Sequence, residues 1–208
     1  LFLSKYEAGK LCEDPIGKRF VKRFVGSEEL INGALRYCIW IEDDEAASAR
    51  ASSSIDARLK AVENSRNCSK AKSTRDFAKK PHRFVQIAGR AVTSAIVVPR
   101  VSSENRDFLP VDYLTNDYIV GDRNFALYDA PLWNMALIAS RLHWVWIGTV
   151  CVRMRTDFSY SNTLGWNTFP LPKLTEKNKS DLTRCAENIL LAREVHYPAT
   201  IADLYDPD

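Results

Sequence analysis

The sequence predicts an α+β fold, in which a mixed or antiparallel sheet is flanked by a basic helical arm, one long buried helix and a C-terminal helix. Short β-branched and aromatic runs separated by turn residues predict the sheet, and apolar residues that recur every three or four positions predict the helices. With 208 residues, 46% of them hydrophobic, the chain is long enough to bury a sizeable core.

Two N-terminal runs supply the first predicted strands. Residues 18–25 alternate basic and apolar side chains, which favours a strand with one solvated face, and Ser27 suits a turn or a helix cap. Residues 35–41 are aromatic and β-branched, which predicts a buried strand, and acidic residues follow it.

The basic arm is predicted at residues 46–80, where the composition shifts to Ala, Ser, Arg and Lys. Sparse apolar positions favour helix there, with a break near residues 64–69. Between Arg58 and Arg90 there are ten basic residues and two acidic ones, so the formal net charge of +3 hides a local positive excess. This excess is either a solvated helix face or a surface that follows phosphates.

The remaining elements follow from turn residues and spacing. Turn residues separate four further expected strands, at residues 84–88, 95–99, 118–120 and 125–128. The long buried helix is predicted at residues 132–152, and an amphipathic helix runs from Thr175 to about His196, where Pro198 closes it.

Composition argues against several classes of protein. No apolar run approaches the roughly 20 residues that a membrane span needs, and the N-terminus lacks the pattern of a signal peptide, so a soluble, cytoplasmic protein is expected. The cysteines form no Cys-x-x-Cys pair, which favours reduced thiols over a disulfide framework or a zinc site.

Catalytic and metal-binding motifs are missing from the sequence. It has no Gly-x-Ser-x-Gly, no Walker loop, no Gly-x-Gly-x-x-Gly after a strand and no His-Glu-x-x-His. The unclustered His82, His143 and His196 are expected to be packing or surface residues, and Cys151 a small core residue. The residues alone favour a binding module without a metal or cofactor of its own.

Short strings in a characteristic order carry a family resemblance. They are residues 24–33 with 36–40, Pro99-Arg100-Val101-Ser102-Ser103-Glu104, Ser140-Arg141-Leu142-His143 with Trp146, Val150-Cys151, Tyr160-Ser161 with Asn167-Thr168-Phe169-Pro170, and residues 201–207. In this order, from about residue 18 onward, they resemble the target-recognition region of the MmeI-like single-chain restriction-modification enzymes and related DNA adenine methyltransferases. Gly148 departs from the family, which usually carries a basic residue there.

The resemblance implies a DNA-specificity domain whose sheet carries recognition loops that select a short asymmetric duplex site. It implies that a methyltransferase domain of the same chain, with an S-adenosylmethionine pocket and an Asn-Pro-Pro-Tyr/Phe motif, methylates adenine at N6 in a prokaryotic, nucleoid-associated protein. No Asn-Pro-Pro string occurs here, so no methylation by this region alone is expected. Residues 1–17 are then a linker, 18–172 the target-recognition domain and 173–208 the start of a C-terminal helical segment.

The family's base-reading positions match six residues of this sequence: Arg100, Asp122, Arg123, Arg155, Asp157 and Ser159. An Arg guanidinium matches guanine O6 and N7, and an Asp carboxylate accepts from cytosine N4. We expect Arg100 with Asp122 to read one G·C pair, and Arg155 with Asp157 to read another from one face of an extended segment. Arg123 is expected to reach a further guanine or a phosphate, with Ser159 leaving room.

Roles that involve no DNA contact stay open for these charged residues. An Arg-x-Asp on a surface turn is commonly an exposed ion pair worth about 0 to 1 kcal/mol. Five basic residues are expected near the DNA backbone or else simply solvated: Lys70, Lys72, Arg75, Lys79 and Lys80.

Two other functions compete with DNA recognition. One is a protein-interaction or assembly module whose basic helix pairs with an acidic partner, and the other is an RNA-binding domain with aromatics on an exposed sheet face. The positions of Arg100, Asp122, Arg155 and Asp157 discriminate between them. Clustering on one exposed face favours duplex DNA, whereas burial or scattering favours an interface.

Overall fold

The computed structural model describes residues 1–87 and 89–206, and the chain divides into two compact units. Unit 1 comprises Leu1–Val25, Leu35–Arg90 and Asp117–Ile119, and unit 2 comprises Gly26–Ala34, Ala91–Asn116 and the chain from Val120 onward. Both units combine helices with antiparallel strands, so the predicted α+β class is confirmed. Within the described residues, no helix combines the length and the apolar character needed to cross a membrane.

The first sheet has the strand order β1 (Phe2–Leu3), β3 (Tyr37–Ile39), β2 (Val21–Val25) and β7 (Tyr118–Val120). Strand β3 pairs antiparallel with both β1 and β2. The expected strand at residues 18–25 begins only at Val21, because residues 15–20 form a helix. Asp14 caps that helix by accepting the amide of Ile16, and proline suits its first turn.

Residues 1–17, expected to be a linker, belong to the folded part of unit 1. They form β1, the helix α1 (Lys5–Cys12) and the start of α2 (Pro15–Phe20). Leu3, Ala8 and Leu11 are buried in the core of this unit. The compact units therefore have no boundary at residue 17.

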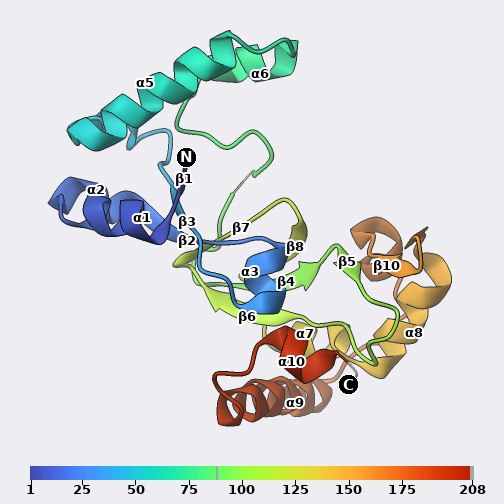
Figure 1. The fold of residues 1–208 in the computed structure, drawn as a ribbon. Helices are drawn as coiled ribbons and strands as arrows, with labels where there is room; N and C mark the ends of the chain where they lie inside the picture. Colours follow the sequence, from blue (N-terminus) through green and yellow to red (C-terminus); the bar gives the residue numbers. More distant parts are fainter. Residues whose placement is uncertain (88, 207–208) are drawn as a thin grey trace. The chain divides into compact units, whose positions relative to one another are not determined.

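The predicted helical arm consists of α4 (Ala46–Ala49), α5 (Ser53–Asn67), α6 (Lys72–Asp76) and a 3-10 turn at Phe77–Lys79 (Figure 1). Ser52 caps α5, and Ile55 and Leu59 are its fully buried apolar residues. The expected break is confirmed, since α5 ends at Asn67 and α6 begins at Lys72.

The prediction of a strand at residues 84–88 is wrong for residues 84–87, which form no strand. Ala88 lies outside the described residues. Phe84 instead packs its ring 5.3 Å from Phe2 and 6.1 Å from Trp40, measured between ring centroids. Phe84 and Ile87 therefore pack in a cluster with Phe24 and Trp40 rather than in a strand ladder, whereas Val85 is exposed.

The central sheet of unit 2 has the order β6 (Asp112–Thr115), β4 (Ser94–Pro99) and β8 (Asn124–Tyr128), with both neighbours antiparallel to β4. Every residue of β4 is buried, as its apolar run predicts. The strands expected at residues 95–99, 118–120 and 125–128 are confirmed, whereas β6 was not expected from the sequence.

A second sheet in unit 2 is short and carries the order β5 (Val101–Ser102), β10 (Asp157–Ser159) and β9 (Arg153–Met154). Phe158 is opposite Ser102 on one side and Arg153 on the other, and Ser159 is opposite Val101. This register determines which side chains share a face, as described below.

The long helix expected at residues 132–152 is two helices, α7 (Trp133–Ile138) and α8 (Arg141–Val150). Ser140 interrupts them because its hydroxyl accepts the amide of His143 at 3.1 Å and donates to the carbonyl of Leu137 at 2.7 Å, which caps a new helix. The expected C-terminal helix is confirmed as α9 (Glu176–Val195), which packs against α7 and is followed by α10 (Ile201–Tyr205). Ser27 begins the short helix α3 (Ser27–Asn32).

Candidate nucleic-acid interface

Three segments that lie far apart in the sequence meet at the end of β4. The amide of Arg100 donates to the carbonyl of Arg123 at 3.2 Å, and the amide of Tyr160 donates to the carbonyl of Arg100 at 2.7 Å. Pro99 is opposite Asn124 in the β4–β8 ladder. The backbone of unit 2 therefore brings residue 100, the turn before β8 and strand β10 together.

A pocket of about 470 Å³, which we call the reading pocket, opens at this junction and is lined by side chains from all three segments. Its walls include Arg100, Arg123 and Ser159, three of the six residues expected to read bases. Arg100 and Arg123 are exposed. The guanidinium of Arg100 lies 4.5 Å from the ring centroid of Phe125, a cation–π contact that limits where this charge can point.

The strand β10 separates a solvent-facing side from a buried side. Asp157 and Ser159 are two residues apart and share one face, whereas Phe158 is buried on the other face, 4.7 Å from Trp144 between ring centroids. Directly paired residues of antiparallel strands share a face, so Met154 lies beside Asp157, and Val101 beside Ser159. We call this set, Val101, Met154, Asp157 and Ser159, the reading face.

Arg155 does not lie in an extended segment, so that expectation is wrong. It begins the two-residue turn of the β9–β10 hairpin with a φ of +60°, the left-handed conformation that such turns demand. Arg153 holds this turn by donating to the carbonyl of Thr156 at 2.9 Å while pairing with Glu104 at 2.6 Å. Arg155 itself is exposed at the hairpin tip.

An aromatic layer supports the junction from within. The buried imidazole of His143 lies 3.1 Å from the hydroxyl of Tyr160, and its ring centroid is 4.6 Å from that of Phe169. Burial lowers the pKa of His143 to about 4, so the ring is neutral at physiological pH, and burial also raises the pKa of Tyr160. His143 and Cys151 are therefore packing residues, as expected.

Gly148 allows helix α8 to lie close to the β9–β10 hairpin. A Cβ atom at this position would lie 3.2 Å from the ring of Phe158, tighter than an ordinary contact. Gly148 therefore has a packing role, because a side chain at this position would push against the ring of Phe158.

The five basic residues expected at the DNA backbone are all exposed in unit 1, but they do not have equivalent partners. Arg75 donates to the carbonyls of Ser69 and Lys70 at 2.8 and 2.7 Å, and so holds the loop before α6. Lys80 pairs with Asp43 at 2.9 Å. Lys70, Lys72 and Lys79 extend from the same arm.

Asp43 anchors this arm, and sequence reasoning did not identify it. Its carboxylate accepts from Lys80, from Arg83 at 2.8 Å and lies 2.7 Å from the Nε2 atom of His82. These hydrogen bonds, with that of Arg83 the strongest, hold the pKa of Asp43 well below its usual range. Arg66 adds hydrogen bonds to the carbonyls of Phe77, Lys80 and Arg83.

Comparison with known families identifies the chain. Residues 1–173 match the family described as MmeI, target recognition domain. The chain belongs to this family. Its fold is that of an MmeI-type target recognition domain.

Two relatives of this MmeI-type domain are much longer than the chain. DNA methyltransferase A of Bacillus subtilis (strain 168) is 35% identical over 188 residues, which cover 90% of this chain and 21% of that protein. The solved structure of the Type IIL restriction-modification enzyme MmeI in complex with DNA has a TM-score of 0.88 and 31% identity. That match covers 99% of this chain and 28% of the MmeI chain.

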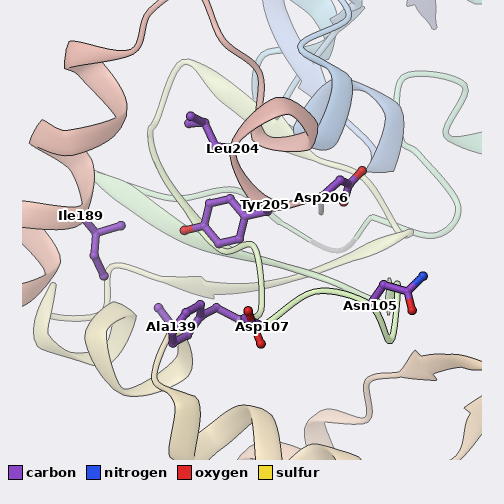
Figure 2. A pocket seen from close by; sticks show the side chains of 8 residues that line it. Asn105, Asp107, Ala139, Ile189, Leu204, Tyr205 and Asp206 are labelled. Carbon is purple, nitrogen blue, oxygen red and sulfur yellow. The ribbon is translucent and has the colours of Figure 1, made fainter. Parts of the chain in front are cut away.

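The MmeI-type domain has another pocket of about 460 Å³, shown in Figure 2. It is lined by residues of α9 and α10, by Ala139 and by the loop around Asp107, and the side chain of Tyr205 is one of those that line it (Figure 2). None of the six expected base-reading residues lines it. Asp206 at its wall pairs with Arg106, whose side chain is 8% exposed, so this pocket borders a structural ion pair.

Sequence reasoning missed the apolar half of the reading face. Val101 and Met154 line the pocket beside Arg100, yet neither has a charge or hydrogen-bonding group that would draw attention in the sequence. The alternation of residues 157–160, polar then aromatic, was the available signal, because it predicts which face of the strand is solvated.

Proposed function

We propose that this chain selects a short, asymmetric site in duplex DNA by contacting base edges in the major groove. The observation that carries the proposal is the convergence of three distant segments, bearing Arg100, Arg123 and Ser159, on one open pocket of unit 2. The β9–β10 hairpin is a two-stranded antiparallel ribbon with one solvated face, a form that the major groove admits. Its relative MmeI, whose structure was solved in complex with DNA, supports the same function.

Arginine and aspartate supply the proposed base contacts. Arg100 donates to guanine O6 and N7, and Asp122, next to Arg123 in the turn before β8, accepts from the paired cytosine. Arg155 and Asp157 form a second such pair at the hairpin tip, where Arg155 approaches from the turn and Asp157 from the strand. Arg123 reaches a further guanine or a phosphate, and the small Ser159 leaves room for the base.

The basic arm of unit 1 supplies phosphate contacts in this proposal. Lys70, Lys72 and Lys79 are the lysines best suited to them, since Arg75 and Lys80 already satisfy other groups. Phosphate contacts raise affinity for all sequences equally, so this arm positions DNA without reading it.

We propose further that the chain is part of a longer adenine-N6 methyltransferase or restriction-modification protein, as the partial coverage of its relatives supports. The described lining of the reading pocket has no acidic residue that could pair with the sulfonium or ammonium group of S-adenosylmethionine, which argues against a cofactor site there. The sequence also has no Asn-Pro-Pro motif. Methyl transfer to a flipped adenine is therefore the task of another domain of that protein.

Single-molecule methylome sequencing of a strain that expresses the full-length protein tests this proposal. The expected result is adenine methylation at one short asymmetric motif that contains at least two G·C pairs. An Arg100→Ala variant is expected to relax that motif at a single G·C position, whereas Arg141→Ala, a matched exposed arginine on α8, leaves it unchanged. A motif without G·C pairs, or an unchanged motif in both variants, would contradict the assigned contacts.

A further inference from the structure

The reading face has an apolar side chain beside its carboxylate. Met154 is 56% exposed and lines the reading pocket. The register of the hairpin places it directly opposite Asp157, on the same face of the ribbon. Its neighbour Arg153 lies on the other face, with its guanidinium 4.4 Å from the ring centroid of Phe158, which confirms the alternation.

The position of Met154 matches the chemistry of a pyrimidine edge. In the major groove, the N4 amino group of cytosine donates a hydrogen bond, and the adjacent C5 atom carries only hydrogen or a methyl group. Paired residues across an antiparallel ladder have Cβ atoms about 5 Å apart. A flexible, unbranched methionine can therefore reach C5 when the neighbouring carboxylate accepts from N4.

We infer that Met154 is a further specificity-determining residue, which contacts the C5 position of the same cytosine that donates to Asp157. This inference rests on the proposed function, since it requires Asp157 to read a base. It adds a distinct consequence, because binding then depends on the methylation of that cytosine. A C5 methyl group packs against the thioether side chain and leaves water, so it strengthens binding.

The experiment uses the full-length protein and duplexes that carry the motif defined by methylome sequencing, with 5-methylcytosine placed at one cytosine at a time. Burial of one methyl group predicts about fourfold tighter binding at a single cytosine, measured as Kd at fixed salt. The gain is expected to disappear in Met154→Ala and to persist in Met154→Leu, which keeps an apolar contact. Leu142→Ala is the matched control, because Leu142 is 68% exposed on α8 and does not line the reading pocket.

Three results would overturn the inference: no methylation effect at any cytosine, an equal effect in Met154→Ala, or weaker binding on methylation. If the protein discriminates its motif from a scrambled duplex in these cases, only the role of Met154 fails. If it does not discriminate the two duplexes at all, the proposed function fails as well.

Discussion

The basic arm of unit 1 and the reading pocket of unit 2 both present cationic side chains, but the two regions hold these side chains differently. Lys72 and Lys79 extend from a short helix and a 3-10 turn and are exposed. Arg100, by contrast, is held by two backbone hydrogen bonds and by its contact with Phe125. A charge that follows phosphates tolerates movement, whereas a group that matches guanine O6 and N7 does not.

The difference extends to what lies beneath each region. The arm depends on ion pairs at the surface, with Asp43 as the common acceptor. The reading face depends on a buried aromatic layer that includes Phe158, Tyr160 and His143. We therefore expect substitutions in the core beneath the reading face to change which DNA sequence is selected. Substitutions in the arm are expected to change the affinity for all DNA sequences alike.

The largest effect is expected when the support of the reading face is removed. Phe158→Ala deletes a buried ring that packs against Trp144, and comparable substitutions lower the free energy of unfolding by about 3 to 5 kcal/mol. Thermal unfolding measures this loss, with Val152→Ala as an exposed control expected to change stability by less than about 0.5 kcal/mol. A stable Phe158→Ala variant with unaltered site selection would show that the face does not depend on this core.

A pH-dependent loss of stability is expected from the same layer. The pKa of His143 is lowered to about 4 in the folded protein, so the unfolded chain binds a proton first as the pH falls below about 6.5. Stability is fully present above that pH and falls by about 2 to 3 kcal/mol as the pH approaches 4. Chemical denaturation at several pH values measures the slope.

Two variants make the pH experiment specific to His143. His143→Gln removes the titrating group and should flatten the slope between pH 6.5 and 4. His196→Gln, at the exposed end of α9, should keep the slope of the unmodified protein. Equal slopes in the unmodified protein and in His143→Gln would assign the pH dependence to other groups.

A smaller effect, confined to one base pair, is expected at Arg100 in the reading pocket. Arg100→Ala should reduce discrimination at a single G·C pair by about 1 to 3 kcal/mol and leave the other positions of the motif unchanged. Competition binding with duplexes that differ at one base pair measures this. A uniform loss across all duplexes would instead assign Arg100 to a phosphate.

The smallest effect is expected in the basic arm. Lys72→Ala should weaken binding to all sequences alike and reduce the slope of log K against log salt by about one. Lys177→Ala is a suitable control, because Lys177 pairs with Asp181 on α9. A change in motif preference in Lys72→Ala would place a base contact in the arm and remove the contrast between the two regions.

The sequence predicts much of this fold, and its errors have physical reasons. Periodicity predicts α5, α9 and β4, because each packs its own apolar stripe or run against a core. It does not predict the break at Ser140, where a hydroxyl replaces a helical hydrogen bond, nor the packing of Phe84 against Phe2 and Trp40. The break at Ser140 is a local competition between side-chain and backbone hydrogen bonds, which periodicity does not register. The packing of Phe84 depends on neighbours that are distant along the chain.

The sequence by itself determined the family, the residue types available for base contacts and the concentration of positive charge in one segment. Only the tertiary structure decided that residues 100, 123 and 159 line one pocket, and that Arg155 occupies a turn while Met154 lies beside Asp157. The physical reason is that sequence spacing governs contacts within a helix or strand. Contacts between segments depend instead on strand register and on which side chains the core can bury.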